Sequence, residues 1–202
     1  MINEKKNNNI KKILLAAGES KRFGDKNKLS EIINGKPIIN HILDTLCQIF
    51  DPSELIVIVG HEQNIIKNLI FNKDIKILEN KDYRKGIGTS IALAINNLNV
   101  DIDGVMIIPG DMPYINSKDL INLEKKFIKL NCVKVVMPKH NYRIGNPVIL
   151  PRNYFKTLKS LKDDFGARSL IRKKDIVTLK TGFGTIFDID TKEELVETKE
   201  NY

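Results

Sequence analysis

The chain has 202 residues and a formal net charge of +8, with 42% hydrophobic and 29% charged residues. This length suits one domain, and no apolar run approaches the roughly 20 residues that a membrane span needs. The basic charge does not by itself indicate nucleic-acid binding, because lysines are interspersed with acidic residues and aromatic side chains do not alternate with basic ones. We expect a cytoplasmic protein without a membrane or nucleic-acid partner, in which residues 1–10 are a disordered lead-in and 11–202 a single domain.

Short apolar runs alternate with helical patterns along the chain. The runs predict strands at 12–16, 55–59, 75–78, 104–109, 133–138, 147–150, 176–180 and 185–189. One helix is predicted over 37–50, where Ile38, Ile42 and Leu46 recur at helical spacing, and another begins after Ser117, the expected N-cap. This alternation predicts an α/β domain with a mostly parallel sheet, whose ligands bind beyond the carboxyl ends of the strands.

The first predicted strand runs into a loop of small and basic residues. Leu15-Ala16-Ala17-Gly18 carries little side-chain bulk at its end, so the backbone can approach a ligand closely. The spacing matches neither GxxxxGK[ST] nor GxGxxG, which disfavours an ATPase P-loop and a dinucleotide-binding turn. We interpret this segment as a different phosphate loop, in which nearby cations meet phosphate oxygens. The candidate cations are Lys21, Arg22, Lys26 and Lys28.

Acidic residues follow two later apolar runs. Asp111 comes directly after the run that ends at Gly110, and a carboxylate at a strand tip suits a hard cation such as Mg²⁺. Asp190 is the second candidate, although it could instead support a helix opened by the capping-box pair Thr191 and Glu194. Asp188 is a weaker candidate metal ligand than Asp111 and Asp190, because its orientation relative to Asp190 depends on how far strand pairing continues.

A glycine-rich turn precedes a further helical stretch. Gly88 to Ser90 could supply backbone donors and a hydroxyl group at the helix N-terminus.

Five motifs in order resemble a known family. They are LAAGESKRFG, Gly110-Asp111-Met112-Pro113, Gly145-Asn146-Pro147-Val148, Gly166-Ala167-Arg168 and Asp188-Ile189-Asp190-Thr191. Together they resemble the MobA-like nucleotidylyltransferases, and more specifically the branch that attaches CMP to molybdopterin. The resemblance covers residues 11–195. It implies a three-layer αβα, Rossmann-like nucleotidyltransferase fold.

The resemblance also implies a reaction and a set of site residues. The reaction is a Mg²⁺-dependent transfer of CMP from CTP to the terminal phosphate of molybdopterin or its molybdenum-loaded form, with release of pyrophosphate. Ala16-Ala17-Gly18, in place of the Ala-Gly-Gly of GTP users, implies CTP. The implied roles are catalytic for Lys28, Arg22 and Asp111; nucleotide-binding for Leu15, Ala16, Ala17, Gly18, Lys28, Gly86 and Ser90; metal-binding for Asp111 and Asp190; and acceptor-binding for Asn146, Pro147, Gly166 and Arg168.

Two departures from the family pattern and two rival functions remain open. One residue more than usual precedes Lys28, so Lys26 competes for the triphosphate, and Asn146 stands where many relatives have His. The first rival is a nucleotidylyltransferase for another phosphorylated acceptor, such as a sugar or polyol phosphate. The second is an accessory protein that delivers molybdenum cofactor to a recipient molybdoenzyme without transferring a nucleotide.

Overall fold

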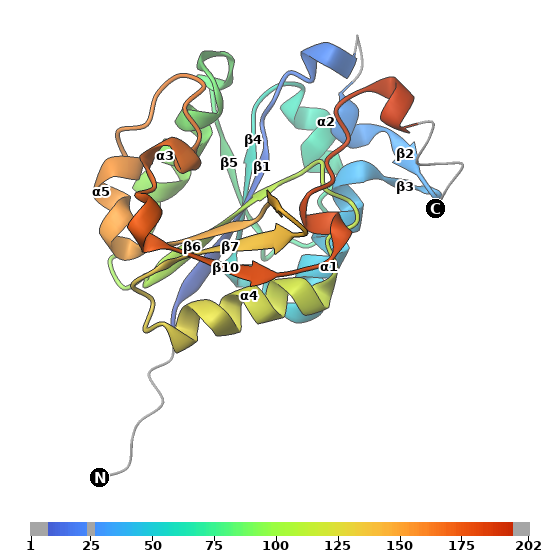
Figure 1. Ribbon diagram of the computed structural model, residues 1–202. Helices are drawn as coiled ribbons and strands as arrows, with labels where there is room; N and C mark the ends of the chain where they lie inside the picture. The colour runs from blue at the N-terminus through green and yellow to red at the C-terminus, as the bar shows by residue number, and fades with distance from the viewer. Residues whose placement is uncertain (1–7, 24–26, 196–202) are drawn as a thin grey trace.

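The computed structural model describes residues 8–23 and 27–195, and one large sheet runs through its centre. The strand order is β10-β7-β9-β6-β1-β4-β5, with β8 paired to β7 (Figure 1). The strands are β1 (Ile10–Ala16), β4 (Leu55–Val59), β5 (Lys76–Glu79), β6 (Gly104–Pro109), β7 (Val135–His140), β8 (Arg143–Ile144), β9 (Val148–Pro151) and β10 (Ile176–Lys180). Strands β6, β1, β4 and β5 pair in parallel, as do β7 and β10, whereas β9 is antiparallel to both its neighbours. The sheet is therefore mixed but mostly parallel.

Helices cover both faces of this sheet and complete a three-layer α/β architecture (Figure 1). Two separate buried clusters define the layers. The first holds apolar side chains of α1 (Ile38–Ile49), α2 (Gln63–Asn68) and α4 (Ser117–Lys129). The second holds those of α3 (Ile87–Asn96) and α5 (Phe155–Leu158). The predicted fold class is confirmed.

Strand β1 shows how the two cores divide. Successive strand side chains point to opposite faces: Leu14 and Ala16 join the α1–α4 cluster, whereas Ile13 joins the α3–α5 cluster. Lys12 is buried on the first of these faces, where its Nζ lies 2.6 Å from Glu54 and 2.8 Å from Glu124. A buried ammonium group is tolerated only with such partners.

Three details differ from the sequence-based expectation. Residues 185–189 form no strand: a 3₁₀ turn covers Phe183–Thr185, and the segment after it is irregular. The N-cap of α4 is Asn116 rather than Ser117, because the Asn116 side chain accepts a hydrogen bond from the Asp119 N–H at 2.8 Å. The two-residue strands β2 (Ile32–Ile33), β3 (Lys36–Pro37) and β8 are too short to produce a readable alternation.

The predicted lead-in falls mostly outside the described residues, since these begin at residue 8. Its last residue, Ile10, already belongs to β1, where it pairs with Gly104. Within residues 8–23 and 27–195, no helix combines the length and the apolar character that a membrane crossing requires.

Candidate active site

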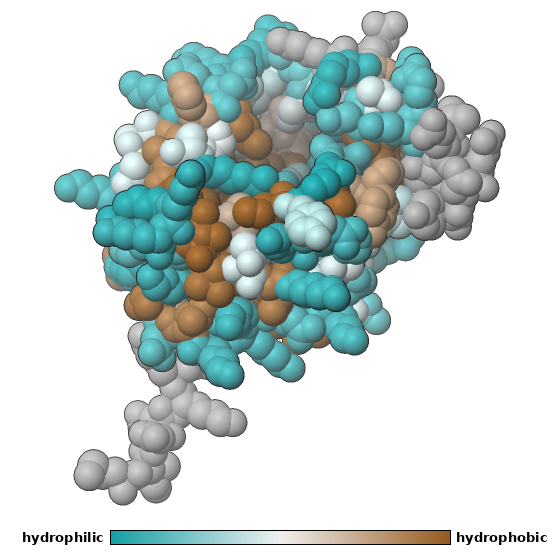
Figure 2. Space-filling view, in the orientation of Figure 1, coloured by the Kyte–Doolittle hydropathy of each residue, from teal (hydrophilic) through white to brown (hydrophobic). Residues whose placement is uncertain are grey.

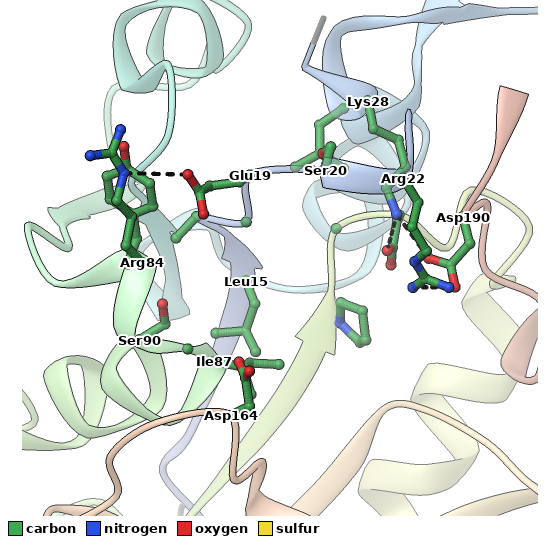
Figure 3. Close-up of a pocket in the computed structure, with 18 residues that line it drawn as sticks. Leu15, Glu19, Ser20, Arg22, Lys28, Arg84, Ile87, Ser90, Asp164 and Asp190 are labelled. Atoms are coloured by element: carbon green, nitrogen blue, oxygen red, sulfur yellow. Dashed lines mark hydrogen bonds and ion pairs between the residues drawn. The ribbon is translucent and has the colours of Figure 1, made fainter. Parts of the chain in front are cut away.

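A cavity of about 430 Å³ opens beyond the carboxyl ends of β1 and β6. It corresponds to the hollow in the upper half of Figure 2. Its walls come from the loop after β1, the loop after β6, the start of α3 and two later loops (Figure 3). The lining residues are Leu15, Ala17, Gly18, Glu19, Ser20, Arg22, Lys28, Leu29, Tyr83, Arg84, Gly86, Ile87, Ser90, Pro109, Gly110, Asp111, Asp164 and Asp190.

The two strand ends are held together by direct backbone contact. The Gly110 N–H donates to the Leu15 carbonyl at 3.0 Å. A Cβ at position 110 would lie 2.9 Å from that carbonyl oxygen, so a larger residue would push the loops apart. Glycine here therefore brings Asp111 beside the end of β1.

Three carboxylates meet near one end of the cavity, and two of them, Asp111 and Asp190, line it. One oxygen from each of Asp111, Asp188 and Asp190 lies within 4.8 Å of the others. The Ile189 N–H donates to the Asp111 carbonyl at 3.1 Å, which joins the two chain segments. Asp188, ranked last from sequence, thus belongs to the same cluster. The signal that could have found it is its spacing: residues two apart in an extended segment share a face.

Two cations face this cluster from the first part of the chain. Lys28 Nζ lies 2.7 Å from Asp111 Oδ2 and 3.2 Å from Asp190 Oδ1. Arg22 forms an ion pair with Asp190 at 2.9 Å and is otherwise mostly exposed. The Asn27 side chain accepts from the Leu29 N–H at 3.1 Å and shapes the short turn that carries Lys28. The competing Lys26 lies outside the described residues.

The carboxylate cluster suits a divalent cation. Partial desolvation raises the pKa of Asp188 above its ordinary value, and the charges of Asp111 and Asp190 raise it further. Asp111 Oδ1 is buried and accepts no hydrogen bond from the described residues. Divalent Mg²⁺ prefers carboxylate oxygen ligands, and its charge would relieve this mutual repulsion. The donor set therefore fits a hard cation.

The start of the C-terminal helical segment is braced without the Asp190 side chain. The Glu194 carboxylate accepts hydrogen bonds from the backbone N–H groups of Asp190 at 2.7 Å and Thr191 at 3.1 Å. In return, the Glu194 N–H donates to the Thr191 hydroxyl at 3.2 Å. The predicted capping box is present, and the Asp190 carboxylate faces the two cations instead.

The far end of the cavity contains the turn that opens α3. Gly86, with φ +115°, and Ser90 both line it, and the Ser90 hydroxyl accepts from Asn80 Nδ2 at 2.9 Å. Ala16, in contrast, does not line the cavity, and its expected role in nucleotide binding, which depends on close backbone approach, stays a prediction. Its side chain is buried on the α1–α4 face, because β1 directs it away from Leu15 and Ala17.

Other lining residues at this end were not among the predicted site residues. Glu19 and Arg84 form an ion pair at 3.3 Å between the first loop and the turn before α3 (Figure 3). Asp164 comes from the loop that follows α5, far along the chain from both. No local motif links these positions, so only the fold brings them together.

The residues expected to bind the acceptor gather beside the cavity rather than in its wall. The Arg168 guanidinium donates to the Gly145 carbonyl and, at 3.0 Å, to Asn146 Oδ1. Burial lowers the pKa of Arg168, and the Asp188 charge opposes this shift. Asn146, Pro147, Gly166 and Arg168 are all absent from the cavity lining. Their acceptor role stays a prediction.

A family model for the MobA-like NTP transferase domain matches residues 12–177. A curated relative, the bifunctional protein GlmU from Clostridioides difficile (strain 630), is 28% identical over 170 residues, which are 83% of this chain and 34% of that protein. Across eight such relatives the chain spans only 22% to 36% of their length.

Solved structures share the fold over nearly the whole chain. Rv0371c from Mycobacterium tuberculosis H37Rv is 20% identical with a TM-score of 0.80, covering 96% of this chain and 98% of that one. The same protein has also been solved in complex with manganese, with a TM-score of 0.79 and 19% identity over 96% of this chain and 100% of that one. Molybdopterin-guanine dinucleotide biosynthesis protein A from Archaeoglobus fulgidus is 19% identical with a TM-score of 0.64, covering 94% and 97%. At these identities the likeness shows the fold alone.

Proposed function

The chain belongs to the MobA-like NTP transferase family, and from this premise we propose that it transfers CMP from CTP to the terminal phosphate of a molybdopterin-type acceptor. The observation that carries the proposal is the placement of Lys28. Its ammonium group lies 2.7 Å from Asp111 and 3.2 Å from Asp190, at one end of a cavity large enough for a nucleotide. Cations beside a cluster of carboxylates fit a triphosphate that binds together with a divalent cation.

The proposed reaction needs no covalent protein intermediate. A terminal phosphate oxygen of the acceptor attacks the α-phosphorus of CTP in line with the bond to the β-phosphate. A new P–O bond forms, the α–β bridging bond breaks, and its electron pair leaves with pyrophosphate. The chain contributes positioning and charge neutralisation through Lys28 and Arg22.

Asp111 and Asp190 would hold Mg²⁺, with Asp188 beside them. When bound, the ion would neutralise charge on the triphosphate and on the leaving pyrophosphate. Lys28 and Arg22 both form ion pairs with Asp190. We infer that the two side chains turn toward phosphate oxygens when the nucleotide and the metal enter.

The molybdopterin part of the proposal draws on the GNPV and GAR motifs and on their contact through Arg168 and Asn146. The Archaeoglobus fulgidus protein, named for molybdopterin-guanine dinucleotide biosynthesis, supports the same acceptor class. A sugar or polyol phosphate is the alternative acceptor. An accessory delivery protein is disfavoured, since such a protein has no need of a lysine held against two metal-type carboxylates.

The test is pyrophosphate release with CTP, GTP, UTP and ATP, each with molybdopterin, with a sugar or polyol phosphate, and without an acceptor. We expect release that requires both CTP and molybdopterin. Release with a sugar or polyol phosphate alone would identify the alternative acceptor, and no release with any pair would favour the delivery protein. The matched variants are Asp111→Asn, which should abolish release, and Asp44→Asn, an exposed carboxylate paired with Lys36, which should not.

A further inference from the structure

Asp164 is a carboxylate in the wall of the nucleotide cavity with no role in the proposed chemistry. It is exposed, and it forms no hydrogen bond or ion pair with any residue that the structure describes. Figure 3 places it beside Ile87, apart from the group formed by Lys28, Arg22 and Asp190. An unpaired carboxylate near the triphosphate would repel it, so this separation suits a different part of the ligand.

The backbone around Asp164 is held against the start of α3. The Gly88 N–H donates to the Asp163 carbonyl at 3.0 Å. A Cβ at Gly86 would lie 2.2 Å from the Asp163 carbonyl carbon, and one at Gly88 would lie 2.7 Å from the Lys162 carbonyl oxygen. Two glycines therefore permit the close approach that places Asp164 at the cavity.

The neighbours of Asp164 suit a flat heterocycle. Leu15 and Ile87 line the same cavity, and Ile87 is 44% exposed although it is apolar. Apolar side chains can cover the face of a ring, while polar groups read its edge. Asp164 and Ser90 are polar residues that line the same cavity as this apolar surface (Figure 3).

We propose that Asp164 determines base specificity by accepting a hydrogen bond from an exocyclic amino group of the nucleobase. A carboxylate accepts from the N4 amino group of cytosine, whereas it faces the O4 carbonyl oxygen of uracil with no proton between them. The inference rests on the proposed nucleotidyltransferase function, because it requires a nucleoside triphosphate in this cavity. It adds the group that would reject UTP.

The test is calorimetric titration of the full chain with the Mg²⁺ complexes of CTP, UTP, GTP and ITP, without acceptor. CTP carries an exocyclic amino group that UTP lacks, and GTP carries one that ITP lacks. The affinity ratio within either pair therefore tests the inference. We expect the wild type to prefer the amino-bearing nucleotide by about 10- to 100-fold, the usual effect of a hydrogen bond to a charged group. Asp164→Asn should reduce this ratio to about threefold or less, because an amide can donate as well as accept.

Asp163→Asn is the matched control. Asp163 contacts α3 through its backbone, its side chain does not line the cavity, and asparagine tolerates its φ of +57°. This variant should keep the wild-type ratio. An unchanged ratio in Asp164→Asn would overturn the inference, and so would equal weakening of both nucleotides, which indicates a contact with ribose or phosphate. A wild-type chain that binds no nucleoside triphosphate would refute the proposed function itself.

Discussion

The replacement Lys28→Ala tests the centre of the proposed mechanism. Lys28 Nζ contacts Asp111 at 2.7 Å and Asp190 at 3.2 Å, and its side chain is only 10% exposed. Loss of one positioned charge-stabilising group costs roughly 3 to 4 kcal/mol in comparable sites. We therefore expect turnover to fall by about 100-fold or more.

Although Lys28→Ala should lower turnover, it should not weaken metal binding. The carboxylate oxygens of Asp111 and Asp190 lie within 4.8 Å of each other, and two unit charges at that distance repel by about 3.5 kcal/mol at an effective dielectric constant of about 20. Without the lysine, the mostly exposed Arg22 is the described cation that still pairs with this cluster, so a bound divalent cation would compensate more of the repulsion. Lys28→Ala should thus bind Mn²⁺ at least as tightly as the wild type. Added Mn²⁺ should raise the melting temperature of the variant more than that of the wild type.

The assays are pyrophosphate release at saturating CTP, acceptor and Mg²⁺, and calorimetric titration with Mn²⁺. Lys36→Ala is the control, because Lys36 is an exposed lysine that pairs with Asp44 away from the cavity. Lys26→Ala should reduce turnover far less than Lys28→Ala. Turnover within about threefold of wild type in Lys28→Ala would refute the reasoning. If the turnover of Lys26→Ala collapsed instead, the extra residue in the loop would have placed Lys26, rather than Lys28, at the triphosphate.

Three further outcomes follow from the site. Asp190→Asn should raise the Mg²⁺ concentration for half-maximal activity with little change in melting temperature, since Glu194 braces the following helical segment. An unaltered Mg²⁺ dependence with a lower melting temperature would remove Asp190 from the metal site. The comparison is Asp111→Asn, which should be severely defective at any Mg²⁺ concentration. CTP should bind more tightly than GTP in calorimetry with Mg²⁺, because the methyl group of Ala17 reduces the space beside the base. A difference of this size is worth about 1 to 3 kcal/mol of selectivity. Tighter binding of GTP would contradict this prediction. The fold raises the pKa of Asp188, so its ionised form destabilises the metal-free protein at neutral pH. Asp188→Asn should therefore melt at a higher temperature than wild type at pH 7 without divalent cations, and this gain should vanish below the ordinary aspartate pKa of about 3.9; a gain that persisted at low pH would contradict the electrostatic explanation.

Much of the candidate site could be predicted because parallel strands end at one edge of their sheet. Asp111 and the loop after β1 each follow an apolar run, and adjacent parallel strands place such loops together. The strand predicted over 185–189 is absent from the structure. Ile189 is buried like a strand residue, but its segment makes isolated hydrogen bonds, as from Ile189 N–H to the Asp111 carbonyl, and no ladder. Periodicity reports burial rather than the hydrogen-bonding partner.

The sequence alone determined the α/β class, the order of most strands and helices along the chain, and the main candidate residues of the site, because these depend on local periodicity and on short motifs. The tertiary structure decided which side chains share the cavity. It turned Ala16 into the core, brought Asp188 to Asp111, and placed Asp164 beside the start of α3. These positions depend on contacts between distant segments, which a single sequence does not encode in any local pattern.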